Sequence, residues 1–279
     1  MIGSEGLKGK IRNIANSKNL RSQEVLQMFF FERFLERLSK SKYKFNFVIK
    51  GGLLISSMIG IDNRTTMDMD TTIKGVPLKE EVIRNIISEI INVEVNDGIE
   101  FEITNISHIR EEDEYENFRV HLIANFDKIK NDMKIDITTG DAITPKEIEY
   151  LYPCMFQEES LRVLAYPLET ILAEKYESVI KRNISTTRMR DFYDLYNLYN
   201  LRKEKIDFDI LKQAIISTAN RRGSFSLMKQ AMEIIKDVKE DDYLKELWKV
   251  YLADNFYVGD LNFSETVKVV EIIAEKIAL

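Results

Sequence analysis

Apolar residues recur at helical spacing over residues 22–39, and this stretch begins with Ser-Gln-Glu, a sequence typical of a helix start. An apolar run over residues 45–49 then predicts a strand that ends at Lys50-Gly51-Gly52. The next elements are predicted, in order, as a short helix, a strand and a longer helix, over residues 53–59, 66–73 and 78–93. The first third of the chain therefore mixes strands with helices.

Three more strands are predicted over residues 100–106, 118–124 and 133–138. From about residue 158 onward the pattern is almost purely helical. We therefore predict an α+β fold, in which a sheet with flanking helices occupies residues 1–150 and a helical domain occupies residues 158–279. The joint is expected near Tyr152-Pro153.

The composition excludes several classes of protein. A net charge of −6 over 279 residues argues against a protein that coats nucleic acid non-specifically. Cys154 is the single cysteine, which excludes an internal disulfide and favours the cytoplasm, and two histidines argue against a His-based zinc or triad enzyme. We see no signal peptide, and no run approaches the roughly 18 apolar residues of a membrane span.

Two carboxylates lie on the second predicted strand. Because side chains alternate along a strand, Asp68 and Asp70 project from one face and Met69 from the other. Neighbouring carboxylates repel each other, and aspartate is disfavoured in strands. A hard divalent cation such as Mg²⁺ between them would remove this conflict. The alternative is an exposed strand face with no ligand.

A third carboxylate, Asp136, lies on a later predicted strand, opposite to Ile135 and Ile137. Two carboxylates on one strand and a third on another can hold two cations roughly 3.5–4 Å apart for in-line displacement at phosphorus. In that arrangement Asp68 and Asp70 hold the metal ions. Asp136 takes a proton from the attacking hydroxyl or orients it.

The motif Lys50-Gly51-Gly52 follows a predicted strand and precedes a helix. Glycine lets the backbone approach a phosphate closely, and the start of the helix offers free N–H groups with a positive end. A glycine pair is also a common tight turn. Its place one short helix before the acidic strand favours a phosphate-binding role.

Charged residues interrupt the apolar stripes of two predicted helices. Over residues 166–182, Lys175 falls within the stripe, whereas Glu174, Glu177 and Lys181 fall on the opposite side. Lys175 therefore either extends its ammonium to water or meets an anion, such as a triphosphate. The next helix carries Asp191 among its buried positions, and Asp194 at the margin.

A buried carboxylate needs a cationic partner, and Lys175 and Arg188 are both candidates for Asp191. Asp191 is the stronger candidate for a site residue, and Asp194 is either a site residue or a structural brace. The segment between these two helices is basic and holds Lys181, Arg182, Arg188 and Arg190. It is either a solvated loop or a contact for an RNA backbone.

Together these motifs resemble those of the AbiEii/AbiGii toxin family, nucleotidyltransferase-like toxins of abortive-infection toxin–antitoxin systems. The resemblance rests on Gly51-Gly52, Arg64-x-Thr66-x-Asp68-x-Asp70, Asp136-Ile-Thr-Thr-Gly-Asp141, Lys175 in Glu-Lys-Tyr, and Arg190-Asp191-Phe-Tyr-Asp194-Leu. It spans residues 51–194, and it implies a polymerase-β-like nucleotidyltransferase core followed by a helical domain.

The motifs themselves and the resemblance together predict site residues, cofactors and partners. The expected catalytic residues are Asp68, Asp70, Asp136, Lys175 and Asp191, of which the first three bind metal. The expected nucleotide-binding residues are Lys50, Gly51, Gly52, Thr66, Lys175 and Asp194. The expected ligands are Mg²⁺ or Mn²⁺ and a nucleoside triphosphate, and the expected partner is a separately encoded antitoxin.

Three functions fit these residues. The first is nucleotidyl transfer from an NTP to an RNA hydroxyl, with a tRNA 3′ end as the leading candidate. The second is the same chemistry on a small molecule or a protein hydroxyl, which the acidity of the chain mildly favours. The third is a non-catalytic nucleotide-binding module, against which the presence of all three carboxylates argues.

Overall fold

The computed structural model describes residues 3–77, 79–109 and 117–279. The chain forms two compact units. Unit 1 comprises residues 1–140 and 148–165, and unit 2 comprises residues 141–147 and 166–279. None of the helices in the described ranges has the length and apolar character that crossing a membrane requires.

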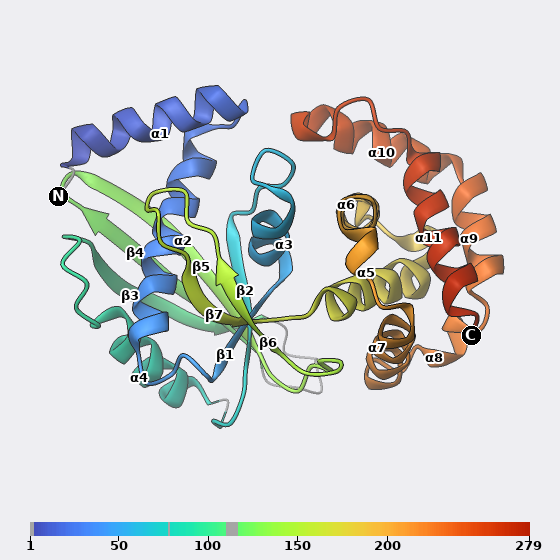
Figure 1. The fold of residues 1–279 in the computed structure, drawn as a ribbon, viewed down its shortest axis with the longest axis horizontal. Coiled ribbons are helices and arrows are strands. Elements are labelled where there is room, and N and C mark those ends of the chain that lie inside the picture. Colours follow the sequence, from blue (N-terminus) through green and yellow to red (C-terminus); the bar gives the residue numbers. More distant parts are fainter. Residues whose placement is uncertain (1–2, 78, 110–116) are drawn as a thin grey trace. The chain divides into compact units, whose positions relative to one another are not determined.

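Unit 1 is built on a mixed sheet, which contains seven strands in the described part of the chain (Figure 1). Their spatial order is β3-β4-β5-β2-β1-β7-β6. The strands are β1 (Phe47–Lys50), β2 (Asp68–Ile73), β3 (Glu100–His108), β4 (Phe118–Phe126), β5 (Ile129–Thr138), β6 (Ile148–Tyr152) and β7 (Leu161–Ala165). β2 runs parallel to β5 and β1 runs parallel to β7, while the other pairs are antiparallel.

In the region of β4 and β5 the sheet has one apolar face and one polar face. Along β4 and β5 every second side chain is buried, as the period of a strand requires, and these buried residues include Val120, Leu122 and Ile135. The helices of unit 1 are α1 (Ser4–Lys18), α2 (Ser22–Lys40), α3 (Gly51–Ile59) and α4 (Glu80–Ile91). α2 packs on β5 and β7, and α4 packs on β3 (Figure 1). The polar side chains of β2, β4 and β5 that alternate with these buried residues project from the opposite face.

Most of the predicted elements of unit 1 are present. The helix predicted over residues 22–39 is α2, and the strands predicted from residues 66, 118 and 133 are β2, β4 and β5. Gly51 and Gly52 belong to the first turn of α3. This helix therefore begins two residues earlier than the predicted start at residue 53. The predicted start of the helix at residue 78 lies outside the described residues.

The expectation of an almost purely helical pattern from residue 158 is wrong at its beginning. Residues 161–165 form β7, which lies between β1 and the edge strand β6. Residues 148–152, which we did not predict as a strand, form β6 at its edge. β7 buries Leu161, Val163 and Ala165 and so follows the period of a strand, but five residues are too few to distinguish it from the start of a helix.

Unit 2 is helical. Its helices are α5 (Leu168–Arg182), α6 (Met189–Arg202), α7 (Phe208–Arg221), α8 (Phe225–Met228), α9 (Ala231–Glu240), α10 (Asp242–Asp254) and α11 (Phe263–Ile277). α5 packs on α6 and α7, and α11 packs on α6 and α9 (Figure 1). α5 is the most buried of these helices, and its fully buried residues include Leu172, Tyr176 and Ile180.

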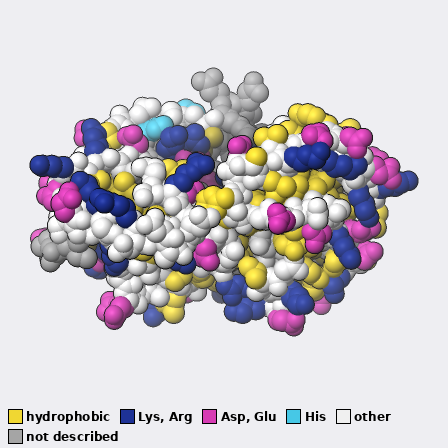
Figure 2. Space-filling model, turned by 90° about the horizontal axis from the view of Figure 1, so that it is seen from above, with side chains coloured by type: hydrophobic (Ala, Val, Ile, Leu, Met, Phe, Trp, Pro, Cys, Tyr) yellow, Lys and Arg dark blue, Asp and Glu magenta, His cyan; other side chains and the backbone are white. Residues whose placement is uncertain are grey.

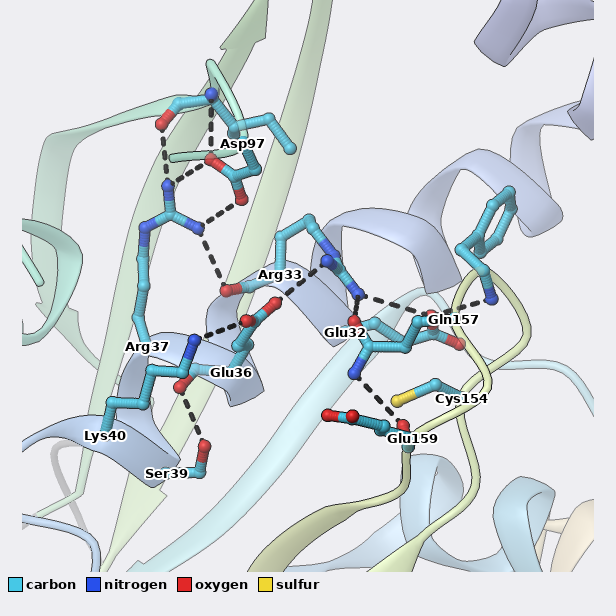
Figure 3. A network of polar contacts seen from close by, with 12 residues as sticks. Glu32, Arg33, Glu36, Arg37, Ser39, Lys40, Asp97, Cys154, Gln157 and Glu159 are labelled. Atoms are coloured by element: carbon cyan, nitrogen blue, oxygen red, sulfur yellow. Dashed lines mark hydrogen bonds and ion pairs between the residues drawn. The ribbon is translucent and has the colours of Figure 1, made fainter. Parts of the chain in front are cut away.

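Charged side chains of α2 connect this helix to distant segments of unit 1 (Figure 3). Arg37 holds Asp97 through two hydrogen bonds of 2.8 and 2.7 Å. The Glu32 carboxylate is buried and accepts hydrogen bonds from the backbone N–H groups of Met155 and Phe156 at 2.7 and 3.3 Å. These contacts fix α2 against the turn before β3 and against the segment between β6 and β7.

Burial raises the pKa of Glu32 to about 7, against the backbone hydrogen bonds and the charges of Arg33 and Lys10, which lower it. The nearby Cys154 thiol has its pKa raised to about 12, chiefly by burial and then by the charge of Glu32. Since the folded protein holds a proton on Glu32 that the unfolded chain releases near 4.5, stability falls as the pH rises from about 4.5 through 7.

We expect Glu32→Gln to remove this pH dependence. The wild-type free energy of unfolding should fall by about 2–3 kcal/mol relative to the variant between pH 4.5 and pH 8. Urea denaturation at four or five pH values measures the two slopes. The absolute stability of the variant is not the readout, because the glutamine amide can accept only one of the two backbone hydrogen bonds. Parallel slopes for the two proteins would contradict the assignment.

Candidate functional site

The structure brings the three predicted carboxylates to neighbouring strands of unit 1. Asp68 and Asp70 lie on β2, and Asp136 lies on the adjacent parallel strand β5, where its Cα is the register partner of Asp70. Register partners in a sheet project from the same face. Met69 is fully buried on the other face, whereas Asp68, Asp70 and Asp136 are partly exposed. The carboxylates therefore share the polar face of the sheet.

Arg119 completes this group, although it belongs to none of the motifs in the sequence. It lies on β4 directly opposite Asp136. Its Nε and a terminal nitrogen donate hydrogen bonds of 2.7 Å each to the two Asp136 carboxylate oxygens. The pKa of Arg119 is raised, chiefly by its hydrogen bond to Asp136, and also by the charges of Asp136, Asp68 and Asp70. The guanidinium therefore lies in the electrostatic field of all three carboxylates.

Gly51 and Gly52 lie so close to neighbouring side chains that neither position has room for a Cβ. Gly51 has a φ of +61°, and a Cβ at this position would overlap the Asp70 carboxylate. A Cβ on Gly52 would lie 2.9 Å from the Thr66 hydroxyl oxygen and 3.1 Å from a terminal nitrogen of Arg64. A larger residue at either position would push the turn away from β2. The absence of side chains is what allows the start of α3 to lie beside Asp70.

Two further predicted nucleotide-binding residues have structural contacts here. Lys50 is the register partner of Asp70, and its Nζ donates a 2.6 Å hydrogen bond to the Thr138 hydroxyl. The Thr66 hydroxyl donates to the Asp68 carbonyl oxygen at 2.9 Å and accepts from the Asp68 N–H at 3.3 Å. Thr66 thus shapes the backbone that leads into Asp68. Within the described residues, no side chain caps the N-terminus of α3, where Lys50 is the N-cap.

Asp68 and Asp70 are the carboxylate donors that this face offers to a divalent cation. Asp68 and Asp70 offer carboxylate oxygens on one face, beside a glycine turn whose space a Cβ would fill, and this all-oxygen set fits Mg²⁺ or Mn²⁺. In the described part of the chain, however, no group of three acidic, histidine or cysteine side chains is arranged to hold a metal ion. At Asp136 both carboxylate oxygens accept hydrogen bonds from Arg119.

A second polar cluster lies in unit 2, where Lys175 of α5 meets both predicted aspartates of α6. Its Nζ lies 2.6 Å from an Asp191 oxygen and 2.9 Å from an Asp194 oxygen. Ser178, one turn further along α5, donates a 2.8 Å hydrogen bond to the second oxygen of Asp191. The Lys175 side chain is 19% exposed, and those of Asp191 and Asp194 are 7% and 0% exposed. The ammonium thus meets two carboxylates within the protein.

Two charged residues of α5 have partners that the sequence did not predict. Glu177, which we placed on the side of α5 opposite to the apolar stripe, is buried and accepts hydrogen bonds from Arg222 at 2.9 Å and Ser224 at 2.6 Å. Lys181 of the basic segment is exposed, and its Nζ donates a hydrogen bond to the Arg222 carbonyl oxygen at 2.9 Å. The other residues of that segment, Arg182, Arg188 and Arg190, are exposed.

The candidate residues thus fall into two sets. Unit 1 holds Lys50, Gly51, Gly52, Thr66, Asp68, Asp70 and Asp136, to which the structure adds Arg119. Unit 2 holds Lys175, Asp191 and Asp194. It also holds Asp141 of the motif that begins at Asp136, and the charge of Asp141 helps to raise the pKa of Arg222.

Two solved structures are similar to this fold. A candidate nucleotidyltransferase from Helicobacter pylori gives a TM-score of 0.51 at 18% identity, covering 92% of this chain and 96% of that chain. JHP933 from Helicobacter pylori gives a TM-score of 0.51 at 17% identity, covering 92% and 93%. At such identities the likeness concerns the fold, and it confirms the predicted α+β, nucleotidyltransferase-like architecture.

The sequence itself identifies the family. A comparison with curated proteins gave no match. The family model described as nucleotidyl transferase AbiEii toxin of type IV toxin–antitoxin systems matches residues 33–277, and so covers both units. The chain therefore belongs to the AbiEii family of nucleotidyl transferase toxins.

Proposed function

We propose that this protein transfers a nucleotidyl group from a nucleoside triphosphate to an RNA hydroxyl, with the 3′ end of tRNA as the leading acceptor. The observation that supports this proposal most is the shared sheet face of Asp68, Asp70 and Asp136 beside the Gly51 turn. Carboxylates beside a close backbone approach suit a phosphorylated substrate with a divalent cation.

In the proposed reaction, Asp68 and Asp70 hold the cation, and the first turn of α3 faces the triphosphate. Bound Mg²⁺ would supply charge neutralisation at the phosphates. The acceptor hydroxyl oxygen forms a bond to the α-phosphorus, and the bond from that phosphorus to the bridging oxygen of the β-phosphate breaks. The hydroxyl proton passes to Asp136 or to water that Asp136 orients, and pyrophosphate leaves.

Exposed cations of unit 2 support an RNA acceptor. Arg182, Arg188 and Arg190 are exposed between the end of α5 and the first turn of α6, and they suit contacts with phosphates. On the face drawn in Figure 2, basic and acidic side chains are interspersed, and neither sign covers a broad area. This distribution favours a local contact over a non-specific one, in line with the net charge of −6.

The proposed biological role follows from the family. We propose that the transfer arrests bacterial growth during phage infection, and that a separately encoded antitoxin relieves the arrest. The roles of Lys175, Asp191 and Asp194 in nucleotide binding are part of the same proposal. Their support is the resemblance of their motifs to those of the family.

Incubation of the protein with each α-labelled NTP, Mg²⁺ and total RNA tests the reaction. We expect label on an RNA of tRNA size, with release of one pyrophosphate for each nucleotide added. Matched reactions with total protein or with small hydroxyl compounds test the other acceptors. If label appeared only in those reactions and not on RNA, the acceptor would be a protein or a small molecule and not an RNA. If the protein bound NTP but released no pyrophosphate with any cell extract, it would be a non-catalytic nucleotide-binding module and not an enzyme.

A further inference from the structure

The bidentate pair between Arg119 and Asp136 occupies atoms that the proposed reaction needs. Both Asp136 oxygens accept a hydrogen bond from the guanidinium, each at 2.7 Å. The fork of an arginine matches a carboxylate in this way, and the pair is stronger than two neutral hydrogen bonds. A second cation at Asp136 would have to displace the guanidinium.

The position of Arg119 allows such a displacement. Its side chain is 34% exposed, whereas that of Asp136 is 14% exposed, so the guanidinium is the more accessible member of the pair. Asp136 is the register partner of Asp70, and Arg119 is the register partner of Asp136, so the three side chains form a row across β4, β5 and β2. An anion arriving at this row would meet a guanidinium that the carboxylates already hold in place.

We propose that Arg119 is a displaceable counter-ion of the acidic cluster, which limits divalent-cation binding in the nucleotide-free protein. It neutralises Asp136 until the phosphates of a nucleoside triphosphate attract the guanidinium and free the carboxylate oxygens. Arg119 is thus a positioning residue for Asp136 and a contact for the substrate phosphates. This inference rests on the proposed function, since it uses the same carboxylates and the same substrate.

Titration of the nucleotide-free protein with Mn²⁺, followed by the electron paramagnetic resonance signal of the free ion, tests this inference. Arg119→Met should bind Mn²⁺ about tenfold more tightly than the wild type. Arg162→Met is the matched control, because Arg162 is an exposed strand arginine paired with Glu149 at 3.4 Å, and it should leave the affinity unchanged. Arg119→Lys keeps the charge but lacks the forked guanidinium, and its Mn²⁺ affinity should lie between those of the wild type and Arg119→Met.

The double variant separates this mechanism from a general effect of charge. If Arg119 acts mainly by occupying Asp136, its removal should raise the Mn²⁺ affinity much less in an Asp136→Asn background than in the wild type, where only its longer-range effect on Asp68 and Asp70 is left. A gain in affinity of the same size in both backgrounds would overturn the proposal, as would an unchanged affinity in Arg119→Met. Thermal melts establish that each variant is folded.

Asp70→Asn in the same titration keeps the two proposals distinguishable. Loss of Mn²⁺ binding in this variant, together with unchanged binding in Arg119→Met, would overturn only the role of Arg119. If Asp70→Asn bound Mn²⁺ as tightly as the wild type, both the metal site of the proposed function and the counter-ion role of Arg119 would be wrong.

Discussion

Asp70→Asn should reduce nucleotidyl transfer by on the order of 100-fold or more and should abolish growth arrest, while leaving the protein folded. Asp70 adjoins two of the features that define the site, because it is the register partner of Asp136 and its carboxylate touches the Gly51 turn. The side chain is partly exposed and lies on the polar face of the sheet, so its shape, which asparagine keeps, is sufficient for packing. Its charge is what the proposed cation requires.

Pyrophosphate release from α-labelled NTP and growth after induced expression measure the loss, and a thermal melt measures folding. The matched control is Asp132→Asn, which removes an exposed aspartate from β5, on the same face of the sheet as Asp136. This control should retain wild-type transfer. Full growth arrest by a folded Asp70→Asn protein would contradict the assignment of Asp70 to the cation.

Lys175→Met should destabilise the protein strongly, by about 3–5 kcal/mol. The single ammonium lies between two carboxylates, at 2.6 Å from Asp191 and 2.9 Å from Asp194. Removing it leaves two buried negative charges next to each other between α5 and α6. The loss of the ion pairs therefore adds to the repulsion between the carboxylates.

Chemical denaturation measures this effect, and two further variants establish its cause. Lys181→Met on the same helix removes a lysine that is 46% exposed, and it should change the stability by less than about 1 kcal/mol. Adding Asp194→Asn to Lys175→Met should recover part of the loss, because it removes one of the two neighbouring negative charges. A Lys175→Met protein as stable as the wild type would show that the cluster does not need its cation.

The same variant tests the nucleotide-binding role that the family resemblance implies for Lys175. NTP affinity is measured without denaturant, at a temperature well below the melting transition, where the variant is still folded. A weakened affinity in the folded variant would support a role in binding as well as in stability. An unchanged affinity would leave Lys175 a structural residue that holds α5 to α6.

Much of the candidate site could be predicted because its patterns are local. Alternation along one strand places Asp68 and Asp70 on the same face, and the helical period places Lys175 on the buried side of α5, where it meets Asp191. These inferences need only the spacing of residues within one element. The fold class followed from the same kind of pattern.

The features that escaped prediction depend on pairings between distant segments. The role of Arg119 depends on the register of β4 against β5. Burial of Glu177 depends on Arg222 and Ser224, which follow it by 45 and 47 residues. At β7 the signal was five residues long, and its strand conformation is fixed by pairing with β1, far away in the sequence.

The order in which the chain enters the two units restricts how the protein can be divided. The backbone leaves unit 1 after residue 140, returns at residue 148 and leaves again after residue 165. A protein shortened at residue 150 would lack β7 and would expose one edge of β1, whose Val48 and Ile49 are the register partners of Leu164 and Ala165. A fragment that contains the whole of unit 1 must therefore extend to residue 165 and carry residues 141–147 with it as a loop.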